Sequence, residues 1–154
     1  MTMRDDAAEY EVATREFLDA VTAVNQDNLD RRIVGGWTAR QVIHHIADSE
    51  AQSYARLRRL IAEPEGSLIQ GYDEAAWANC AALGYEDLPI DHSLAVFESA
   101  RQSSLDVLGR LTDSDLTRYG VHSASGRYTL AFWITTYCAH PREHAAQLIE
   151  AINA

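Results

Sequence analysis

Lysine is missing from this 154-residue chain, and all thirteen basic side chains are arginine. Asp and Glu together number 23, which leaves a formal net charge of −10. Proteins that bind nucleic acid or anionic membranes gather Lys and Arg into dense patches, because phosphate binding depends on clustered positive charge. The sequence contains no such patch. We therefore expect neither nucleic acid nor a membrane as the main partner.

Cysteine is scarce as well, and no long hydrophobic run is present. Cys80 and Cys138 lie far apart without C-x-x-C spacing, as a reducing compartment allows. No run of about 18 apolar residues predicts a membrane span, and the first residues lack the pattern of a signal peptide. We therefore expect a cytoplasmic protein. Cys138 falls on an apolar helical stripe, where a buried and unreactive thiol is the common case.

Strand patterns are nearly absent, and the chain has only 8 glycines and 3 prolines to interrupt helices. Hydrophobic residues make up 47% of the sequence and charged residues 23%, which is the composition of an ordinary globular protein. A chain of this length can bury most of its apolar surface around one core. We therefore predict a single domain that spans residues 1–154.

Four segments carry the three- and four-residue apolar spacing of a helix with one buried face. The first lies within residues 5–27. Thr38 is the predicted N-cap of the second helix, which runs to Pro64. Asp91 and Thr129 are the predicted N-caps of the third and fourth helices.

The connection between the second and third helices, residues 64–89, lacks a long period, and a short helix is predicted at Asp73–Ala82. A connection of this length can cross the molecule from one end to the other. The predicted fold is an all-α four-helix bundle with a long crossover between helices two and three. If Tyr72, Asp73 and Trp77 lie over a site in the bundle, they would imply a substrate pocket there.

The last predicted helix contains HPREH, which matches the pattern H-x-x-E-H. In zinc peptidases with this pattern, two histidines bind the metal and the glutamate acts on water. His140 and His144 are one helical turn apart, a spacing at which two imidazoles can share one ion. Glu143, however, lies about 160° from the apolar centre of the helix, on the solvent side. The pattern therefore does not predict a peptidase.

A metal site needs a third ligand, and the second helix offers His44 and His45. Both lie on the flank of that helix's apolar stripe, and the periodicity favours His45 only slightly. The alternative interpretation is that the inward histidines are hydrogen-bonded core residues without a metal. His92 and His122 lie in or near loops and are expected to be solvated.

Pro141 lies inside the last predicted helix, where it removes one main-chain donor and presses on the preceding turn. The carbonyl of Tyr137 would then need water or a side chain as its partner. Two interpretations are open: the proline is a tolerated kink, or the kink directs His140 toward the site.

Three stretches of the chain together resemble the DinB-like superfamily (DNA-damage-inducible, YfiT-type): GWTARQVIHHIADSE, GYDEAAWA and HPREHAAQL. The resemblance covers most of the chain. It implies a four-helix bundle, often a homodimer, with a three-histidine site for a divalent metal such as zinc or nickel. On this sequence the implied ligands are His45, His140 and His144. Asp48 and Gln147 are then candidates for orienting the imidazoles, or else solvated polar residues.

The resemblance also implies a chemistry. Three imidazoles leave open positions on an ion, which is the layout of a catalytic site. Characterised branches of the superfamily use a low-molecular-weight thiol, mycothiol or bacillithiol, in S-transfer to electrophiles. We therefore predict a metal-dependent thiol S-transferase that acts on a small molecule. The alternatives are a metal-dependent hydrolase and a non-catalytic stress or ligand-binding bundle, and no catalytic residue is assigned.

Overall fold

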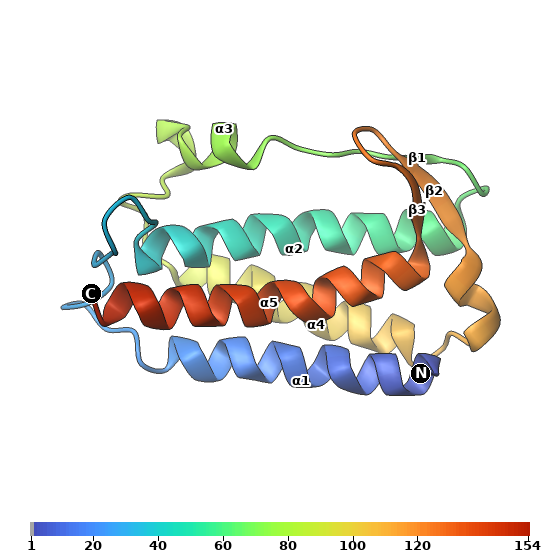
Figure 1. Ribbon diagram of the computed structural model, residues 1–154, viewed down its shortest axis with the longest axis horizontal. Helices are drawn as coiled ribbons and strands as arrows, with labels where there is room; N and C mark the ends of the chain where they lie inside the picture. The colour runs from blue at the N-terminus through green and yellow to red at the C-terminus, as the bar shows by residue number, and fades with distance from the viewer. Residues whose placement is uncertain (1) are drawn as a thin grey trace.

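The computed structural model, which describes residues 2–154, confirms the predicted four-helix bundle (Figure 1). The long helices are α1 (Met3–Val21), α2 (Ala39–Ala62), α4 (Asp91–Leu108) and α5 (Leu130–Ile152). Shorter helical turns lie between them: α3 (Glu74–Ala78), η1 (Ala81–Leu83) and η2 (Asp113–Thr117). Within residues 2–154, no helix combines the length and the apolar character of a transmembrane span.

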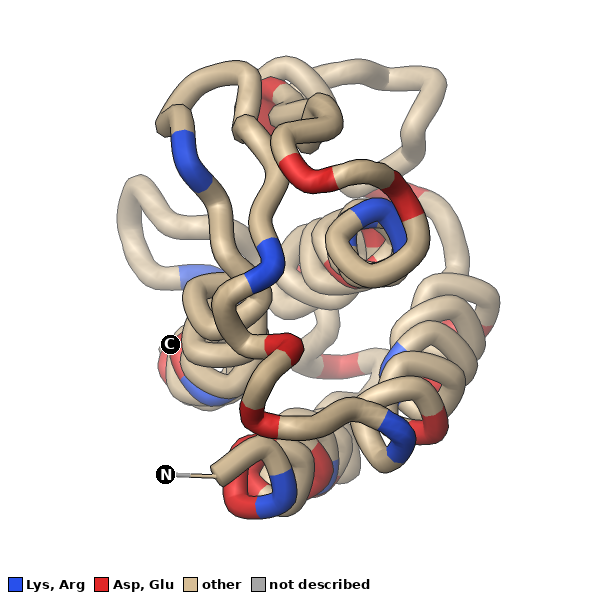
Figure 2. The backbone as a smooth tube through the Cα atoms, turned by 90° about the vertical axis from the view of Figure 1, so that its right-hand side faces the viewer, with Lys and Arg blue, Asp and Glu red and all other residues tan. Residues whose placement is uncertain are grey.

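The four helices do not alternate in direction along the chain. Helices α2 and α4 run the same way and pack side by side, while α1 and α5 run the opposite way (Figure 1). The connection from α2 to α4, residues 63–90, therefore returns along the full length of the bundle, and we call it the crossover. Seen along the bundle, the helices surround one axis, and acidic and basic positions are interspersed (Figure 2).

Two of the predicted helix starts are confirmed. The hydroxyl of Thr38 accepts from the N–H of Gln41 at 3.1 Å, and the Gln41 side chain accepts from the N–H of Thr38 at 2.9 Å, which forms a capping box. Thr129 accepts from the N–H of Phe132 at 3.1 Å. Both helices thus begin where the sequence predicts, because caps of this kind depend on residues only three positions apart.

One predicted helix start is wrong. Asp91 is not the N-cap of α4 but its first helical residue, because Ile90 already has helical dihedral angles, φ −84° and ψ −12°. Helix α1 spans Met3–Val21, so it begins just before the predicted window of residues 5–27 and ends inside it. After it, the side chains of Asn25 and Asn28 bond to nearby main-chain N–H groups and hold a turn that competes with the helix.

A small sheet adds to the helical fold. Strands β1 (Leu68–Ile69), β2 (Tyr119–His122) and β3 (Gly126–Thr129) lie in the order β1-β2-β3. Strands β2 and β3 form an antiparallel hairpin, and β1, from the crossover, pairs with β2 in parallel. The sheet thus ties the crossover to the hairpin above one end of α2 (Figure 1). Strands of two to four residues are too short to show a period in the sequence.

The bundle interior holds two apolar clusters with a polar layer between them. One cluster surrounds Trp133, and the other surrounds Phe97. Glu50 and Arg101 lie between the clusters along α2 and α4, and their side chains are fully buried. A buried ion pair is unusual in a core of this size, and it lies at the level of the functional site described next.

Candidate metal centre

Three histidines from two helices meet inside the bundle. His45 of α2 and His140 and His144 of α5 each offer a ring nitrogen, and these atoms all lie within 4.8 Å of one another. The two Nε2 atoms of His140 and His144 are 3.0 Å apart, and the ring of His45 is centred 4.7 Å from that of His144. The structure therefore brings together the three histidines named as ligands by the family resemblance.

His44 takes a different place. Its Nδ1 lies 2.7 Å from the hydroxyl of Ser93, and its Nε2 lies 3.1 Å from the carbonyl oxygen of Leu88. The ring is buried and both nitrogens have partners, so it is a satisfied structural histidine that joins α2 to the crossover and to α4. Helical periodicity barely separates His44 from His45, and these contacts favour His45 as the candidate third ligand.

The three clustered imidazoles are neutral near pH 7. Burial, together with the nearby His144, lowers the pKa of His45 to about 4. Burial, together with His144 and His45, lowers the pKa of His140 to about 3. Burial also lowers the pKa of His144. Neutral imidazoles keep the lone pairs that a metal ligand needs.

Two buried nitrogens in the cluster have no hydrogen-bond partner within residues 2–154: Nδ1 of His45 and Nδ1 of His140. Buried polar atoms in proteins normally have a hydrogen-bond partner. These two nitrogens lack one, and no carboxylate among the described residues bonds to the three rings. A divalent ion could accept the lone pair of one nitrogen from each of the three rings. The residues present therefore fit a three-histidine metal site.

Gln147, which the sequence leaves as either a group that orients an imidazole or a solvated polar residue, contacts one of the rings. Its side-chain oxygen lies 2.7 Å from Nδ1 of His144, so Nδ1 carries the proton and donates. The lone pair of His144 is then on Nε2, which faces His140. A partner of this kind fixes both the tautomer and the ring orientation of a metal ligand.

Asp48, the other residue considered for orienting a ring or else as a solvated polar residue, does not bond to the three clustered rings. Its carboxylate accepts a hydrogen bond from the hydroxyl of Tyr85 at 2.6 Å, away from the three clustered rings. At about 100° per residue, Asp48 lies about 40° around α2 from His44 and about 60° from His45, so it is closer to the face of His44. Burial and the neighbouring carboxylate raise the pKa of Tyr85, which keeps its hydroxyl protonated. The contact attaches the crossover to α2.

Pro141 has no main-chain N–H, so the carbonyl of Tyr137 lacks its usual helical donor. Arg101 donates to that carbonyl instead. Nη1 of Arg101 donates to it at 2.7 Å, while Nη2 donates to the carbonyl of Tyr10 at 2.8 Å. The same Nη1 lies 3.4 Å from a carboxylate oxygen of Glu50. This buried network supports α5 directly before His140.

The sequence contained a signal for Arg101 that its apolar setting obscured. Arg101 is the one charged residue on the stripe that also includes Leu94, Phe97, Leu105 and Leu108. A charge at such a position is buried only when it is paired and hydrogen-bonded. The partners, however, come from three other helices, and no local spacing predicts them.

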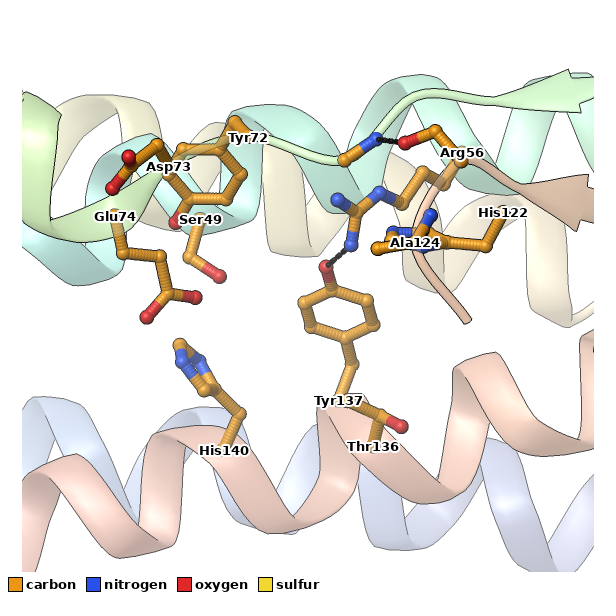
Figure 3. A pocket seen from close by; sticks show the side chains of 12 residues that line it. Ser49, Arg56, Tyr72, Asp73, Glu74, His122, Ala124, Thr136, Tyr137 and His140 are labelled. Carbon is orange, nitrogen blue, oxygen red and sulfur yellow. Dashed lines mark hydrogen bonds between the residues drawn. The ribbon is translucent and has the colours of Figure 1, made fainter. Parts of the chain in front are cut away.

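A pocket of about 480 Å³ lies beside the cluster, between α2, α5, the crossover and the β2–β3 hairpin. Tyr72 and Asp73 of the crossover line it, and Trp77 packs against Tyr72 with ring centres 4.7 Å apart. Figure 3 shows His140 and Glu74 at one end and Arg56 at the other. The crossover thus roofs a substrate-sized space next to the histidines.

The structure also shows where His92, His122 and Glu143, the glutamate of the H-x-x-E-H pattern, lie. Glu143 and His92 are exposed, as expected. The expectation that His122 is solvated is wrong, because β2 carries it into the pocket wall, where it is half-buried and stacks on Tyr128 at 5.6 Å. Cys138 is not in the pocket, and burial raises the pKa of its thiol to about 11.

The sequence of residues 9–148 matches the family model that describes the DinB superfamily. The chain belongs to the DinB superfamily. DinB relatives of known sequence include a protein of Oceanobacillus iheyensis, 36% identical over 141 residues, with 91% of this chain and 80% of the relative covered. A Bacillus mycoides protein is also 36% identical over 141 residues and is covered to 79%. Both are provisionally named metal-dependent hydrolases.

A solved DinB-type structure is similar over nearly the whole fold. YfiT from Bacillus subtilis superimposes with a TM-score of 0.85 at 29% identity, which covers 97% of this chain and 85% of that one. It is described as a probable metal-dependent hydrolase with an unusual four-helix bundle topology. The DinB assignment thus agrees with the parallel α2 and α4 joined by the crossover.

Proposed function

We propose that this DinB protein is a metal-dependent enzyme in which His45, His140 and His144 hold a divalent ion, zinc or nickel. The observation that carries the proposal is the convergence of three neutral imidazoles within 4.8 Å beside a pocket. When bound, such an ion lowers the pKa of a water or thiol and so supplies a nucleophile near neutral pH.

Hydrolysis of a small substrate is the first candidate reaction. The crossover carries Glu74 into the pocket lining, and its carboxylate points toward His140 (Figure 3). An exposed carboxylate at that place can take the proton that an attacking water releases. Hydrolysis is further supported by the names of the relatives and by the description of YfiT.

Transfer of a low-molecular-weight thiol, of the mycothiol or bacillithiol type, is the second candidate. Neither cysteine of the chain lines this pocket, so a thiol nucleophile would have to enter as a co-substrate. A pocket of about 480 Å³ with polar groups at both ends offers space for a small thiol together with its electrophile. Thiol transfer would need no protein base once the thiol is ionised.

Metal content is the first test. Protein produced in medium supplemented with zinc and nickel should retain one divalent ion per chain, and His45→Ala, His140→Ala and His144→Ala should each lose it. His92→Ala is the matched control, because His92 is exposed and is not part of the cluster. Elemental analysis that finds no bound ion in the wild-type protein would refute the metal site.

Activity of the metal-loaded protein then separates the reactions. Turnover of activated esters or amides without added thiol supports hydrolysis, and Glu74→Gln should slow it by about 100-fold or more if Glu74 is the base. Conjugation of a thiol to a bimane that depends on the ion supports S-transfer. A protein that keeps its ion but does neither is a metal- or ligand-binding bundle, and the proposal of an enzyme fails.

A further inference from the structure

The end of the pocket opposite the histidines carries a guanidinium without a carboxylate partner. Arg56 of α2 lines the pocket, where Nη1 donates to the hydroxyl of Tyr137 at 3.1 Å and Nη2 donates to the carbonyl of Gln70 at 3.2 Å. Its Nε is buried and has no acceptor among the described residues. Both of the acceptors that Arg56 does have are neutral.

A missing carboxylate does not by itself distinguish Arg56, because Arg31, Arg58 and Arg118 also donate only to neutral oxygens. Among the arginines of residues 2–154, a buried nitrogen without an acceptor is found only in Arg56. Carboxylates lie within ion-pair distance of Arg15, Arg40, Arg59, Arg101 and Arg142. Within residues 2–154 no carboxylate lies within that distance of Arg56, although the chain has 23 acidic residues. Nη1 and Nη2 each use one of their two N–H groups on a neutral acceptor, so each keeps a second N–H for a ligand. A partly buried guanidinium with unused donors costs free energy unless an anion binds it. The arrangement therefore points to a partner from outside the chain.

His122 supplies a second donor at the same end. Its Nδ1 accepts from the main-chain N–H groups of Ala124 at 3.2 Å and Ser125 at 3.3 Å, which leaves the ring proton on Nε2. That nitrogen lies against Gly71 of the crossover, where an added Cβ would come within 3.3 Å of it. The hairpin thus holds a neutral imidazole with its N–H at the pocket wall.

The two ends of the pocket lie along one groove. Arg56 follows His45 by eleven residues, about three turns of α2 plus 20°, so both lie on the same face of the helix. Figure 3 shows Arg56 and His122 at one end of the pocket and His140, Asp73 and Glu74 at the other. The acidic residues of the pocket are therefore gathered beside the proposed ion, away from the guanidinium.

We propose that Arg56, assisted by His122, binds an anionic group of the substrate, a carboxylate or a phosphate, while the reacting bond lies at the histidine end. The substrate class is thus a small molecule with an anion at one end and an electrophilic centre at the other. This assignment rests on the proposed metal site only for the position of the reacting bond. A planar guanidinium with free donors is the side chain best suited to two-oxygen anions.

The test uses hydroxamic acids as probes, because the hydroxamate binds the zinc of the loaded protein. The probes end in a carboxylate, a phosphonate or a primary amide and have linkers of increasing length. Calorimetry on the zinc-loaded wild-type protein should show an anionic probe binding at least about tenfold more tightly than the amide of equal length. The tighter of the two anionic probes identifies the anion.

Variants assign this preference to Arg56. Arg56→Met should abolish the anion preference while leaving the affinity for the amide probe unchanged, which also shows that the variant is folded and loaded. Arg56→Lys should keep part of the preference, since it keeps the charge without the fork. The matched control is Arg59→Met, because Arg59 is exposed on the same helix and pairs with Glu63. An anion preference that persists in Arg56→Met overturns the proposal, as does a wild-type protein without any preference.

An experiment on the metal-free protein tests the anion site independently of the metal site. If no probe binds through its hydroxamate, the proposed function fails, and succinate and inorganic phosphate are titrated into the metal-free protein by NMR. Shifts of the Gly71 and Ser123 amide signals that disappear in Arg56→Met uphold the anion site by itself. The absence of Arg56-dependent shifts refutes it.

Discussion

Nη1 of Arg101 donates a hydrogen bond to the main-chain carbonyl of Tyr137 at 2.7 Å. That carbonyl is the one that Pro141 leaves without a helical donor, four residues further along α5. The guanidinium therefore closes the gap in the helix, and its ion pair with Glu50 connects the gap to α2. His140 lies between the two ends of the gap, so the network contacts the stretch of α5 that carries one of the proposed ligands.

Replacing Arg101 with methionine should destabilise the fold by about 3–5 kcal/mol, because Glu50 would remain as a buried charge without its partner. Urea unfolding of the metal-free protein measures this change in the free energy of unfolding. Arg110→Met, at an exposed position just after the end of α4, should change the free energy of unfolding by less than about 0.5 kcal/mol.

The double variant Arg101→Met, Glu50→Leu distinguishes the ion pair from simple packing. Removing both charges should be less damaging than removing Arg101 alone, because no unpaired charge is left. Strictly additive losses would show that the two side chains are not coupled.

Gln147→Leu should weaken zinc binding by about 10–100-fold, because Nδ1 of His144 loses the acceptor that fixes its tautomer. Competition with a chromophoric chelator measures the affinity. Gln147→Glu keeps an acceptor at the same place and should bind zinc more tightly than the leucine variant. If the leucine variant binds as tightly as the wild type, Gln147 does not orient the ring.

The stability of the metal-free protein should fall as the pH drops below about 6.5. The pKa of His45 is lowered to about 4 and that of His140 to about 3, whereas both are near 6.5 in the unfolded chain. Between these values the unfolded chain binds more protons, so unfolding becomes easier by up to about 1.4 kcal/mol per pH unit for each histidine.

Unfolding in the presence of a chelator, followed at several pH values from neutral down to about 4, measures this dependence. His140→Asn should show a shallower loss of stability on acidification than the wild type, whereas His92→Asn, at an exposed position, should not differ from it. Equal pH dependence in the wild type and His140→Asn would contradict the lowered pKa.

The two cysteines should react with iodoacetamide at very different rates. Cys80 is exposed, while burial raises the pKa of Cys138 to about 11 and leaves it as an unreactive thiol near neutral pH. Mass spectrometry of the native protein should find the label on Cys80 alone, and in urea on both. Native Cys80→Ser should remain unlabelled, and rapid labelling of that variant would show that Cys138 is accessible.

Local patterns in the chain were sufficient to predict the four long helices and two of the three clustered histidines. The 3.6-residue apolar period and the caps at Thr38 and Thr129 act between residues a few positions apart, so they can be recognised without a structure. The same holds for the spacing of His140 and His144. The family resemblance, carried by three short motifs, supplied His45 as the third candidate ligand.

Contacts between distant segments decided the rest. The pairing of β1 with β2, the capture of the Tyr137 carbonyl by Arg101, and the meeting of Arg56 with His122 each join residues dozens of positions apart. Such contacts depend on how the crossover and the hairpin fold back over the bundle. A helical period says which face of a helix is buried but not what lies opposite it, and so the pocket and its two chemically different ends appear only in the folded chain.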